Sequence, residues 1–360
     1  MELVYLPMAD VYLSLPLLFA IGLGGGILSS MLGIGGGILI TPSLMSIGVP
    51  SVVAIATQLN NSVGTNFSGF LAYQQERDVD LSLAWYLFMG GLAGALVEGL
   101  TLTQVESKAG SYAVLKIIVF FVVIISSVIT FIQSQRPIQP RVEKGAMMRR
   151  WMIYFPWHKI FLRSRVEMSI LVPLGVGFLT GTITTSIGGG NSLLMAPIIM
   201  YLLGRSSPVV AGTSLLAGFG INVVVTFITS IGRAPVDFVL LVILSISSII
   251  GSLIGSRLAY KFRTQTLKVF GSIVLMAIAL KMYLDLKAVH WQTTSRSQNF
   301  FHKFPSVLKK IQAMPEQKWM LPIAQYAHDF PVEYTVISLV CVTIFACIMQ
   351  FANNYITRRM

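Results

Sequence analysis

A four-residue motif, Ile-Gly-Gly-Gly, occurs twice in this chain, at residues 34–37 and 187–190, and a proline follows each copy (Pro42 and Pro197). Consecutive glycines hold a regular helix poorly, because each costs about 1 kcal/mol relative to alanine. A helix that begins at such a break presents unpaired N–H groups and the positive end of its dipole, and glycine lets an anion approach closely. The motifs therefore predict binding of a small oxyanion. Close helix packing through small residues is the alternative, and it suits the glycine-rich stretch Gly22–Gly26 just upstream.

Amide and hydroxyl side chains follow both motifs, densely between residues 57 and 68 and more sparsely between residues 191 and 226. A lipid-facing helix would not tolerate so many amides. These groups can donate hydrogen bonds to an oxyanion without the desolvation cost of a full charge, and they can also bond between helices. The predicted substrate-binding residues are Gly35, Gly36, Gly37, Thr57, Asn60, Asn66, Gly188, Gly189, Gly190, Asn191, Thr213 and Asn222.

The composition is that of a polytopic membrane protein: 54% of the 360 residues are hydrophobic, 11% are charged, and the mean hydropathy is +0.75. Soluble proteins carry about 25% charged residues. A membrane-spanning helix needs about 20 apolar residues, and two shorter runs after the glycine motifs, 36–48 and 189–203, suit half-helices or re-entrant arms. The predicted spans are 13–33, 51–73, 81–103, 111–133, 166–186, 207–231, 236–257, 265–287 and 332–352.

The chain contains an internal duplication that extends well beyond the glycine motif. In each half, a glycine motif separates a pair of apolar segments. If that pair forms a re-entrant hairpin or two crossings, the chain changes sides of the membrane an odd number of times in each half, so the second half is inverted. If the pair forms one long crossing, the two halves are parallel. We therefore predict an all-α polytopic membrane protein with two inverted multi-helix repeats, Gly-broken or re-entrant helices, and one extra C-terminal helix. The matched residues include Thr57, Asn66 and Asp80 in the first half and Thr213, Asn222 and Asp237 in the second.

The net charge of +12 is concentrated in a way that argues against nucleic acid as a partner. Residues 134–165 hold eight basic residues against one acid, which is typical of a cytoplasmic loop. Aromatic residues among these charges suggest a segment that lies on anionic lipid headgroups. The predicted organisation is a first transmembrane repeat (1–133), this basic cytoplasmic loop (134–165), a second transmembrane repeat (166–287), a polar insertion (288–331), and a final transmembrane helix and tail (332–360).

No catalytic or cofactor-binding motif is present. The sequence lacks a Walker loop, a GxSxG elbow and an HExxH helix, so we predict neither an enzyme nor an ATP-driven pump. The two cysteines, Cys341 and Cys347, lie in the last apolar segment and exclude a disulfide or metal framework. Three histidines in the 288–331 insertion have spacings that match no helical ligand pair, so we expect no metal site.

The duplicated arrangement resembles the sulfite exporter family called TauE/SafE, over roughly residues 14–287. This resemblance implies a bacterial inner-membrane transporter with two duplicated modules that moves small sulfur oxyanions or organosulfonates, usually described as export. The long insertion and the extra final segment are atypical of the family. The resemblance is carried by Leu32 to Gly37 with Pro42, by Ser186 to Gly190 with Pro197, by Ala54–Thr57 and Val210–Thr213, and by Asp80 and Asp237.

We expect a multi-pass secondary transporter of a small anion, with sulfite or an organosulfonate as the leading substrate. The two halves would rock against each other around a site between them. The expected partners are this anionic substrate and membrane lipids at the basic loop. A passive anion channel and a non-transporting membrane scaffold are the alternatives.

Overall fold

The structure is a computed structural model, and several predicted features lie outside the residues it describes. Among these are six of the predicted site residues (Gly35, Gly36, Gly188, Gly189, Gly190 and Asn191), the predicted half-helix 189–203 apart from isolated residues, and most of the spans 111–133 and 265–287. The described residues are 3–32, 37–76, 78–105, 157–161, 163–164, 166–187, 208–231, 236–261, 320–329 and 331–359, with isolated residues within 121–131, 195–199 and 269–280.

The protein is mostly helical, as the sequence predicts, and two small β-hairpins accompany the helices. The strands are β1 (Leu3–Leu6), β2 (Val11–Ser14), β3 (His158–Phe161) and β4 (Val166–Ser169). The helices are α1 (Leu15–Leu32), α2 (Gly37–Ser46), α3 (Ser51–Gln75), α4 (Leu81–Val105), α7 (Leu171–Ile187), α9 (Pro208–Ile231), α10 (Phe238–Lys261), α14 (Met320–Asp329) and α15 (Pro331–Arg359).

Four of the described helices are long and apolar enough to cross a membrane, namely α4, α9, α10 and α15, while α1 and α7 are shorter apolar helices. The 25-residue helix α3 is long enough but is not among the four. Its amide and hydroxyl residues lower its mean hydropathy, and all of those between Thr57 and Ser68 are buried inside the bundle. The polar central helix is therefore covered by apolar ones, which is how a membrane protein accommodates such residues.

The hairpins correct the all-α prediction. Strands β1 and β2 pair antiparallel, as do β3 and β4, and each hairpin leads directly into the first helix of its half. The segment predicted as a span from residue 166 therefore begins as strand β4, and helix α7 begins only at Leu171. Each strand contains at least one Val, Ile, Tyr or Phe, which are residues that favour strands. At four residues each, β2 and β4 could not be distinguished from the apolar helix that follows.

Two helix pairs on opposite sides of the bundle pack through the same glycine pattern. In the first pair, Gly22 and Gly26 of α1 face Ser247 and Ser248 of α10, and Gly251 and Gly255 of α10 face Leu23 and Ile27 of α1. In the second pair, Gly90 and Gly94 of α4 face Leu174 and Phe178 of α7, and Gly177 and Gly181 face Leu87 and Gly91. Because the residue numbers rise together in both partners, each pair is parallel, with a GxxxG face on each helix. The packing role expected for Gly22–Gly26 is confirmed at Gly22 and Gly26.

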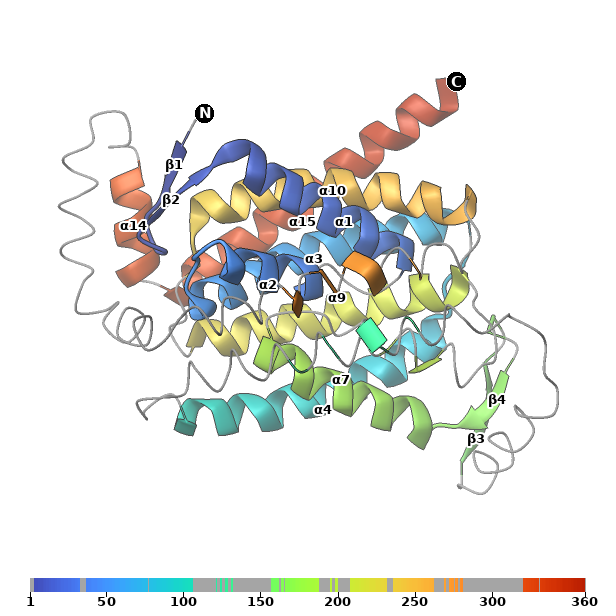
Figure 1. Cartoon of the computed structure of the whole chain (residues 1–360). Coiled ribbons are helices and arrows are strands. Elements are labelled where there is room, and N and C mark those ends of the chain that lie inside the picture. Colours follow the sequence, from blue (N-terminus) through green and yellow to red (C-terminus); the bar gives the residue numbers. More distant parts are fainter. Residues whose placement is uncertain are drawn as a thin grey trace.

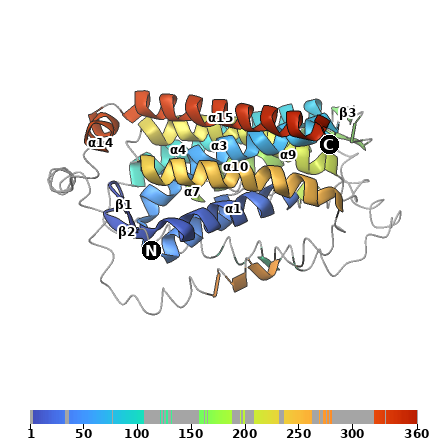
Figure 2. The same ribbon diagram turned by 90° about the horizontal axis from the view of Figure 1, so that it is seen from above.

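Helices α3 and α9 cross antiparallel at the centre, between these two pairs (Figure 1). The rings of Phe67 on α3 and Phe219 on α9 lie 4.9 Å apart, and Gly69 of α3 faces Leu215 of α9. Figure 2 shows α15 as an outer layer over these central helices. Val342 of α15 fills the space above Gly64 of α3.

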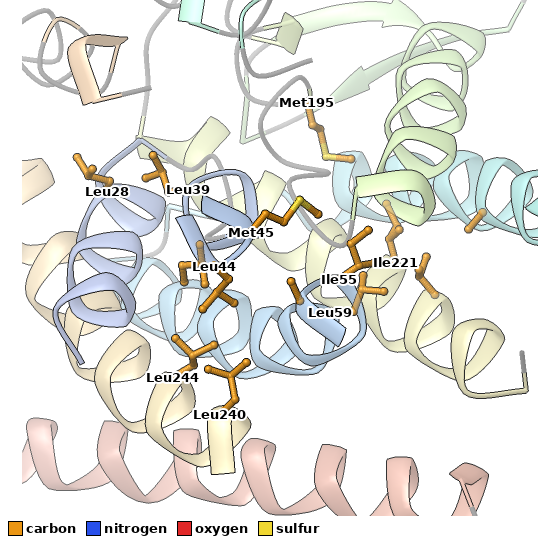
Figure 3. Close-up of a cluster of buried hydrophobic side chains, with 14 of the residues drawn as sticks. Leu28, Leu39, Leu44, Met45, Ile55, Leu59, Met195, Ile221, Leu240 and Leu244 are labelled. Atoms are coloured by element: carbon orange, nitrogen blue, oxygen red, sulfur yellow. The ribbon is translucent and has the colours of Figure 1, made fainter. Parts of the chain in front are cut away.

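The two hairpins lie at opposite ends of the bundle (Figure 1). Helices α1 and α10 both begin at the end that carries β1–β2, whereas α4 and α7 both begin at the end that carries β3–β4. Met45 of α2, Leu59 of α3 and Ile221 of α9 belong to one buried apolar cluster (Figure 3). This cluster fixes the half-helix α2 against the central helix α3.

Candidate functional site

Most of the amide and hydroxyl groups in the middle of α3 are bonded to neighbouring groups. The amide of Asn61 donates to the Gln58 Oε1 at 3.1 Å, and the Ser248 hydroxyl of α10 donates to the Asn61 Oδ1 at 2.8 Å. The hydroxyls of Thr65 and Ser248 lie 3.0 Å apart. For these residues the alternative of interhelical hydrogen bonding is confirmed.

Asn60, a predicted substrate ligand, points to the other side of α3 and is held by α15. The Ser338 hydroxyl donates to the Asn60 Oδ1 at 2.9 Å, and the Asn60 amide makes a long 3.5 Å contact with the Ala56 carbonyl. Asn60 is therefore already engaged in attaching the extra helix.

Asn66 and Asn222 are fully buried and, unlike Asn60 and Asn61, have unused hydrogen-bonding groups. Neither the Nδ2 nor the Oδ1 atom of either side chain has a hydrogen-bond partner among the described residues, and both residues have 0% exposure. A buried amide left without partners costs about 1–3 kcal/mol. The two residues occupy matching positions in the duplicated halves. Buried polar groups normally have a hydrogen-bond partner, so these two amides are the candidates for contact with a polar substrate.

The two asparagines lie at nearly the same depth in the bundle. Phe67 of α3 lies opposite Phe219 of α9, and these helices run antiparallel. Asn66 immediately precedes Phe67, and Asn222 follows Phe219 by three residues. At 1.5 Å of rise per residue, the two amides are within about one helical turn of each other along the bundle.

The N-terminus of the half-helix α2 lies at the same depth. Gly25 of α1 faces Ile40 of α2, so Gly37, three residues before Ile40, is level with about residue 28 of α1. Ser30 of α1 faces Gly69 of α3, and both helices begin at the β1–β2 end, so residue 28 is level with about residue 67 of α3. Gly37, the first residue of α2, therefore lies level with Asn66. The positive end of the α2 dipole and an unsatisfied amide share one level of the bundle.

Thr57 and Thr213, the other described ligand candidates, lie far from this level. Nine residues separate each from the asparagine of its helix, a distance of about 13.5 Å along an α-helix. The structure therefore brings Asn66, Asn222 and Gly37 to one depth and places Asn60, Thr57 and Thr213 elsewhere.

Thr57 belongs to a buried cluster at the β1–β2 end, which we call the Asp237 cluster (Asp237, Thr57 and Met8). The Asp237 N–H donates to the Thr57 hydroxyl oxygen at 3.1 Å. The Asp237 Oδ1 accepts the Leu240 N–H at 3.1 Å, which caps the start of α10, and its Oδ2 accepts the Met8 N–H from the β1–β2 turn at 2.8 Å. One carboxylate thus joins a helix of the second half to the hairpin of the first.

Thr213 belongs to a matching cluster at the opposite end, which we call the Asp80 cluster (Asp80, Thr213 and Ser164). The Asp80 N–H donates to the Thr213 hydroxyl at 2.9 Å, and the Asp80 Oδ1 accepts the Leu83 N–H at 3.1 Å, capping α4. The Asp80 Oδ2 accepts both the N–H and the hydroxyl of Ser164, at 3.0 and 2.9 Å, from the β3–β4 turn. Sequence reasoning did not predict these clusters, although the aspartate repeated just before each helix was a usable signal.

Burial raises the pKa of the Asp237 carboxyl to about 6, although hydrogen bonds from the backbone N–H groups of Leu240, Met8, Ala9 and Val239 act in the opposite direction. In the part of the chain that the structure describes, no group of three or more His, Cys, Asp or Glu residues could hold a metal ion. The two cysteines are free and exposed on α15.

Comparison with known proteins places the chain in its sequence context. The family model for the sulfite exporter TauE/SafE matches residues 18–282. Two Bacillus subtilis proteins are similar along nearly their whole length: "Probable membrane transporter protein YjnA" is 25% identical over 264 residues (72% of this chain, 96% of the relative), and "Probable membrane transporter protein YunE" is 27% identical over 281 residues (76% and 98%). A "Probable membrane transporter protein" of Xylella fastidiosa is 28% identical over 133 residues (36% and 51%). No solved structure matches.

Proposed function

Because the chain belongs to the TauE/SafE sulfite exporter family and is a membrane transporter, we propose that it is a secondary transporter of a small anion, with sulfite or an organosulfonate as the substrate. The observation that carries this proposal is the pair of buried asparagines, Asn66 and Asn222, whose amides have no partner among the described residues. The name of the family supports the sulfur oxyanion, while the names of the curated relatives specify no substrate.

The substrate site that we propose lies where α3 and α9 cross. The Asn66 and Asn222 amides each offer two N–H donors, and α2 begins at Gly37 on the same level with its unpaired backbone N–H groups. These donors would bind the oxygens of an anion without a buried lysine or arginine, which keeps the affinity low enough for release. The remaining glycines of the two motifs and Asn191 are proposed to line the site as well, although they lie outside the described residues.

We further propose that the two halves form an inverted repeat. Three matching relations support this proposal: α1 pairs with α10 as α7 pairs with α4, Thr57 bonds Asp237 as Thr213 bonds Asp80, and the two hairpins lie at opposite ends. A two-fold axis in the membrane plane, passing between α3 and α9, would relate them. This arrangement lets the two halves exchange conformations so that one central site opens alternately to each side.

The orientation in the membrane follows from the charges. The basic loop 134–165 leads into β3–β4, so we propose that this end faces the cytoplasm of a bacterial inner membrane. Trp157 is 70% exposed beside this hairpin, which suits a ring at the lipid headgroups. The β1–β2 hairpin and the Asp237 cluster would then face the outside, and lipid headgroups would contact the basic loop.

The proposed function is tested by flux in proteoliposomes of the purified protein. Vesicles are loaded with radiolabelled sulfite and challenged with taurine, sulfoacetate, sulfate and chloride, with and without a pH gradient. We expect saturable sulfite flux that responds to the gradient, that organosulfonates inhibit, and that Gly36→Val abolishes. Flux that is neither saturable nor gradient-dependent would favour the channel, and no flux of any tested anion from folded protein would overturn the proposal.

A further inference from the structure

Asn66 and Asn222 lie on helix faces that meet at the same interface. Tyr73 of α3 packs on Gly212 of α9, and Asn66 precedes Tyr73 by seven residues, which is about two helical turns. The ring of Phe219 on α9 packs on α3, and Asn222 follows it by three residues. Residues three, four or seven apart share one face of a helix. Both unsatisfied amides therefore belong to the faces that α3 and α9 present to each other.

Thr226 adds a third unsatisfied group to this interface. It follows Asn222 by four residues, so the two side chains share the α9 face that packs on α3. The Thr226 side chain is 1% exposed, and its hydroxyl has no hydrogen-bond partner among the described residues. The matching position on α3 holds Phe70, four residues after Asn66. The hydroxyl therefore belongs to one half only, and the interface is asymmetric at this point.

The three polar groups follow one another along the bundle. Asn66 adjoins Phe67, whose ring packs on Phe219, and Asn222 and Thr226 come three and seven residues after Phe219 on α9. Asn222 therefore lies between the other two in depth. The Cα–Cβ bond of a helical residue tilts toward the N-terminus of its helix. Because α3 and α9 are antiparallel, the side chains of Asn66 and Thr226 lean toward each other along the bundle.

These groups offer hydrogen-bond acceptors as well as donors. Each asparagine leaves both its Nδ2 and its Oδ1 without a partner in the described chain, so it does not matter which end of the amide is assigned as oxygen. A threonine hydroxyl also donates and accepts. An anion that only accepts hydrogen bonds would leave the amide oxygens unpaired, and a buried unpaired acceptor is unfavourable. A ligand with its own O–H or N–H satisfies both kinds of group.

The charge available at the site also limits the ligand. Among the side chains that the structure describes, no lysine, arginine or histidine is buried. The start of α2 supplies about half a positive charge, and the amides add only dipoles. A second negative charge on the ligand would be buried without a counter-charge from these residues, which is costly. This set of groups therefore suits a singly charged anion.

We infer that the site selects a singly charged oxyanion that carries its own hydrogen-bond donor. Its oxygens lie toward Asn66 and the start of α2, and its donor lies toward Asn222 and Thr226. Hydrogensulfite, the protonated form that coexists with sulfite near neutral pH, has this chemistry, whereas fully deprotonated sulfite has two charges and no donor. The inference rests on the proposed function, because it concerns the same site. The names of the family and of the relatives specify no ionisation form and assign no role to Thr226.

The test compares two monoanions of nearly the same shape. Sulfamate and methanesulfonate carry the same sulfonate oxygens and a single charge, but sulfamate has an amino group where methanesulfonate has a methyl group. Each is added to proteoliposomes that take up radiolabelled sulfite, with equal pH on both sides so that no proton gradient contributes. Binding is measured separately, as the rise in unfolding temperature that each anion causes in the purified protein.

We expect sulfamate to inhibit uptake at a roughly tenfold lower concentration than methanesulfonate, because methanesulfonate leaves a buried acceptor unpaired. Thr226→Val removes the hydroxyl at nearly constant volume, so this preference should largely disappear, whereas Thr226→Ser should retain it. Thr343→Val is the matched control and should behave as the wild type, because the Thr343 hydroxyl on α15 donates to the Leu339 carbonyl of its own helix.

Equal inhibition by the two anions, or a preference for methanesulfonate, would overturn the inference, while the sulfite flux itself would leave the proposed function standing. This comparison in the wild-type protein does not depend on the folding of any variant. A folded Thr226→Val protein that keeps the preference would overturn the orientation that we infer.

If no sulfite flux is observed, the unfolding temperatures distinguish the two proposals. Stabilisation by sulfamate at a roughly tenfold lower concentration than by methanesulfonate would support the selectivity of the site and contradict transport. Equal stabilisation by both anions, or none by either, would overturn the inference as well.

Discussion

At the scale of single residues, burial and hydrogen bonding distinguish amides that hold the fold together from amides available to a ligand. Asn60 and Asn66 lie six residues apart on the same helix, and both have 0% exposure. Asn60 accepts the Ser338 hydroxyl, whereas Asn66 has no partner among the described residues. The sequence predicted both as ligands because residue type and spacing are alike. Only the position of α15, more than 270 residues along the chain, distinguishes them.

The first prediction compares these two asparagines. Asn66→Leu replaces an unsatisfied buried amide by an apolar group of similar size, so we expect the thermal stability to stay the same or to rise. Asn60→Leu removes the bond to Ser338, so we expect a loss of about 1 kcal/mol. Sulfite flux should respond in the opposite order, nearly absent in Asn66→Leu and largely retained in Asn60→Leu. Unfolding in detergent and flux in proteoliposomes check both expectations.

A lower stability in Asn66→Leu together with normal flux would assign this amide to structure and remove it from the proposed site. Asn222→Leu provides a matched repetition in the second half, because its amide is equally buried and equally without partners in the described chain.

At the scale of elements, the sequence predicted helices better than it predicted what they touch. The predicted spans 51–73, 81–103, 207–231 and 236–257 correspond closely to α3, α4, α9 and α10. These helices could be predicted because a long apolar run is a signal within the local sequence. The Asp237 cluster joins Met8 to a residue 229 positions away, and no local pattern could reveal it. The strands of the hairpins were missed for a different reason, since each has only four residues, which are too few to show the alternation that marks a strand.

The second prediction concerns the parallel glycine pair α1 and α10. A Cβ at Gly26 would overlap the Ser248 backbone, which cannot move without shifting α10, so we expect Gly26→Ala to destabilise the protein by about 1–3 kcal/mol. Gly24, two residues earlier on the same helix, has open space around its Cβ position. Gly24→Ala should be neutral or stabilising by up to about 1 kcal/mol, because alanine favours the helix. Thermal unfolding of both variants in one detergent measures the difference, and equal stabilities would contradict the packing described for α1 and α10.

At the scale of the whole molecule, the contacts of the two capping aspartates with the two hairpins form one pattern. Each half contributes the hairpin of one end and the capping aspartate of the other, so the two halves are joined at both ends by equivalent bonds. The sequence predicted inversion from the parity of its crossings, and the position of the hairpins at opposite ends supports the inverted repeat that we propose. Helix α15 has no counterpart in the duplication and contacts α3, α9 and α10 on one side. It therefore removes the equivalence of the two ends.

The last prediction tests the inverted arrangement directly. Leu3 on β1 is 61% exposed and Ile160 on β3 is 61% exposed, so a cysteine at either position would meet solvent. With Cys341 and Cys347 replaced by alanine, a membrane-impermeant thiol reagent added to intact cells should label Leu3→Cys but reach Ile160→Cys only after the membrane is opened. Parallel halves would place both hairpins on one side, and the two cysteines would then be labelled together. Because the two positions have equal exposure, a difference in labelling reports the side of the membrane and not the local accessibility.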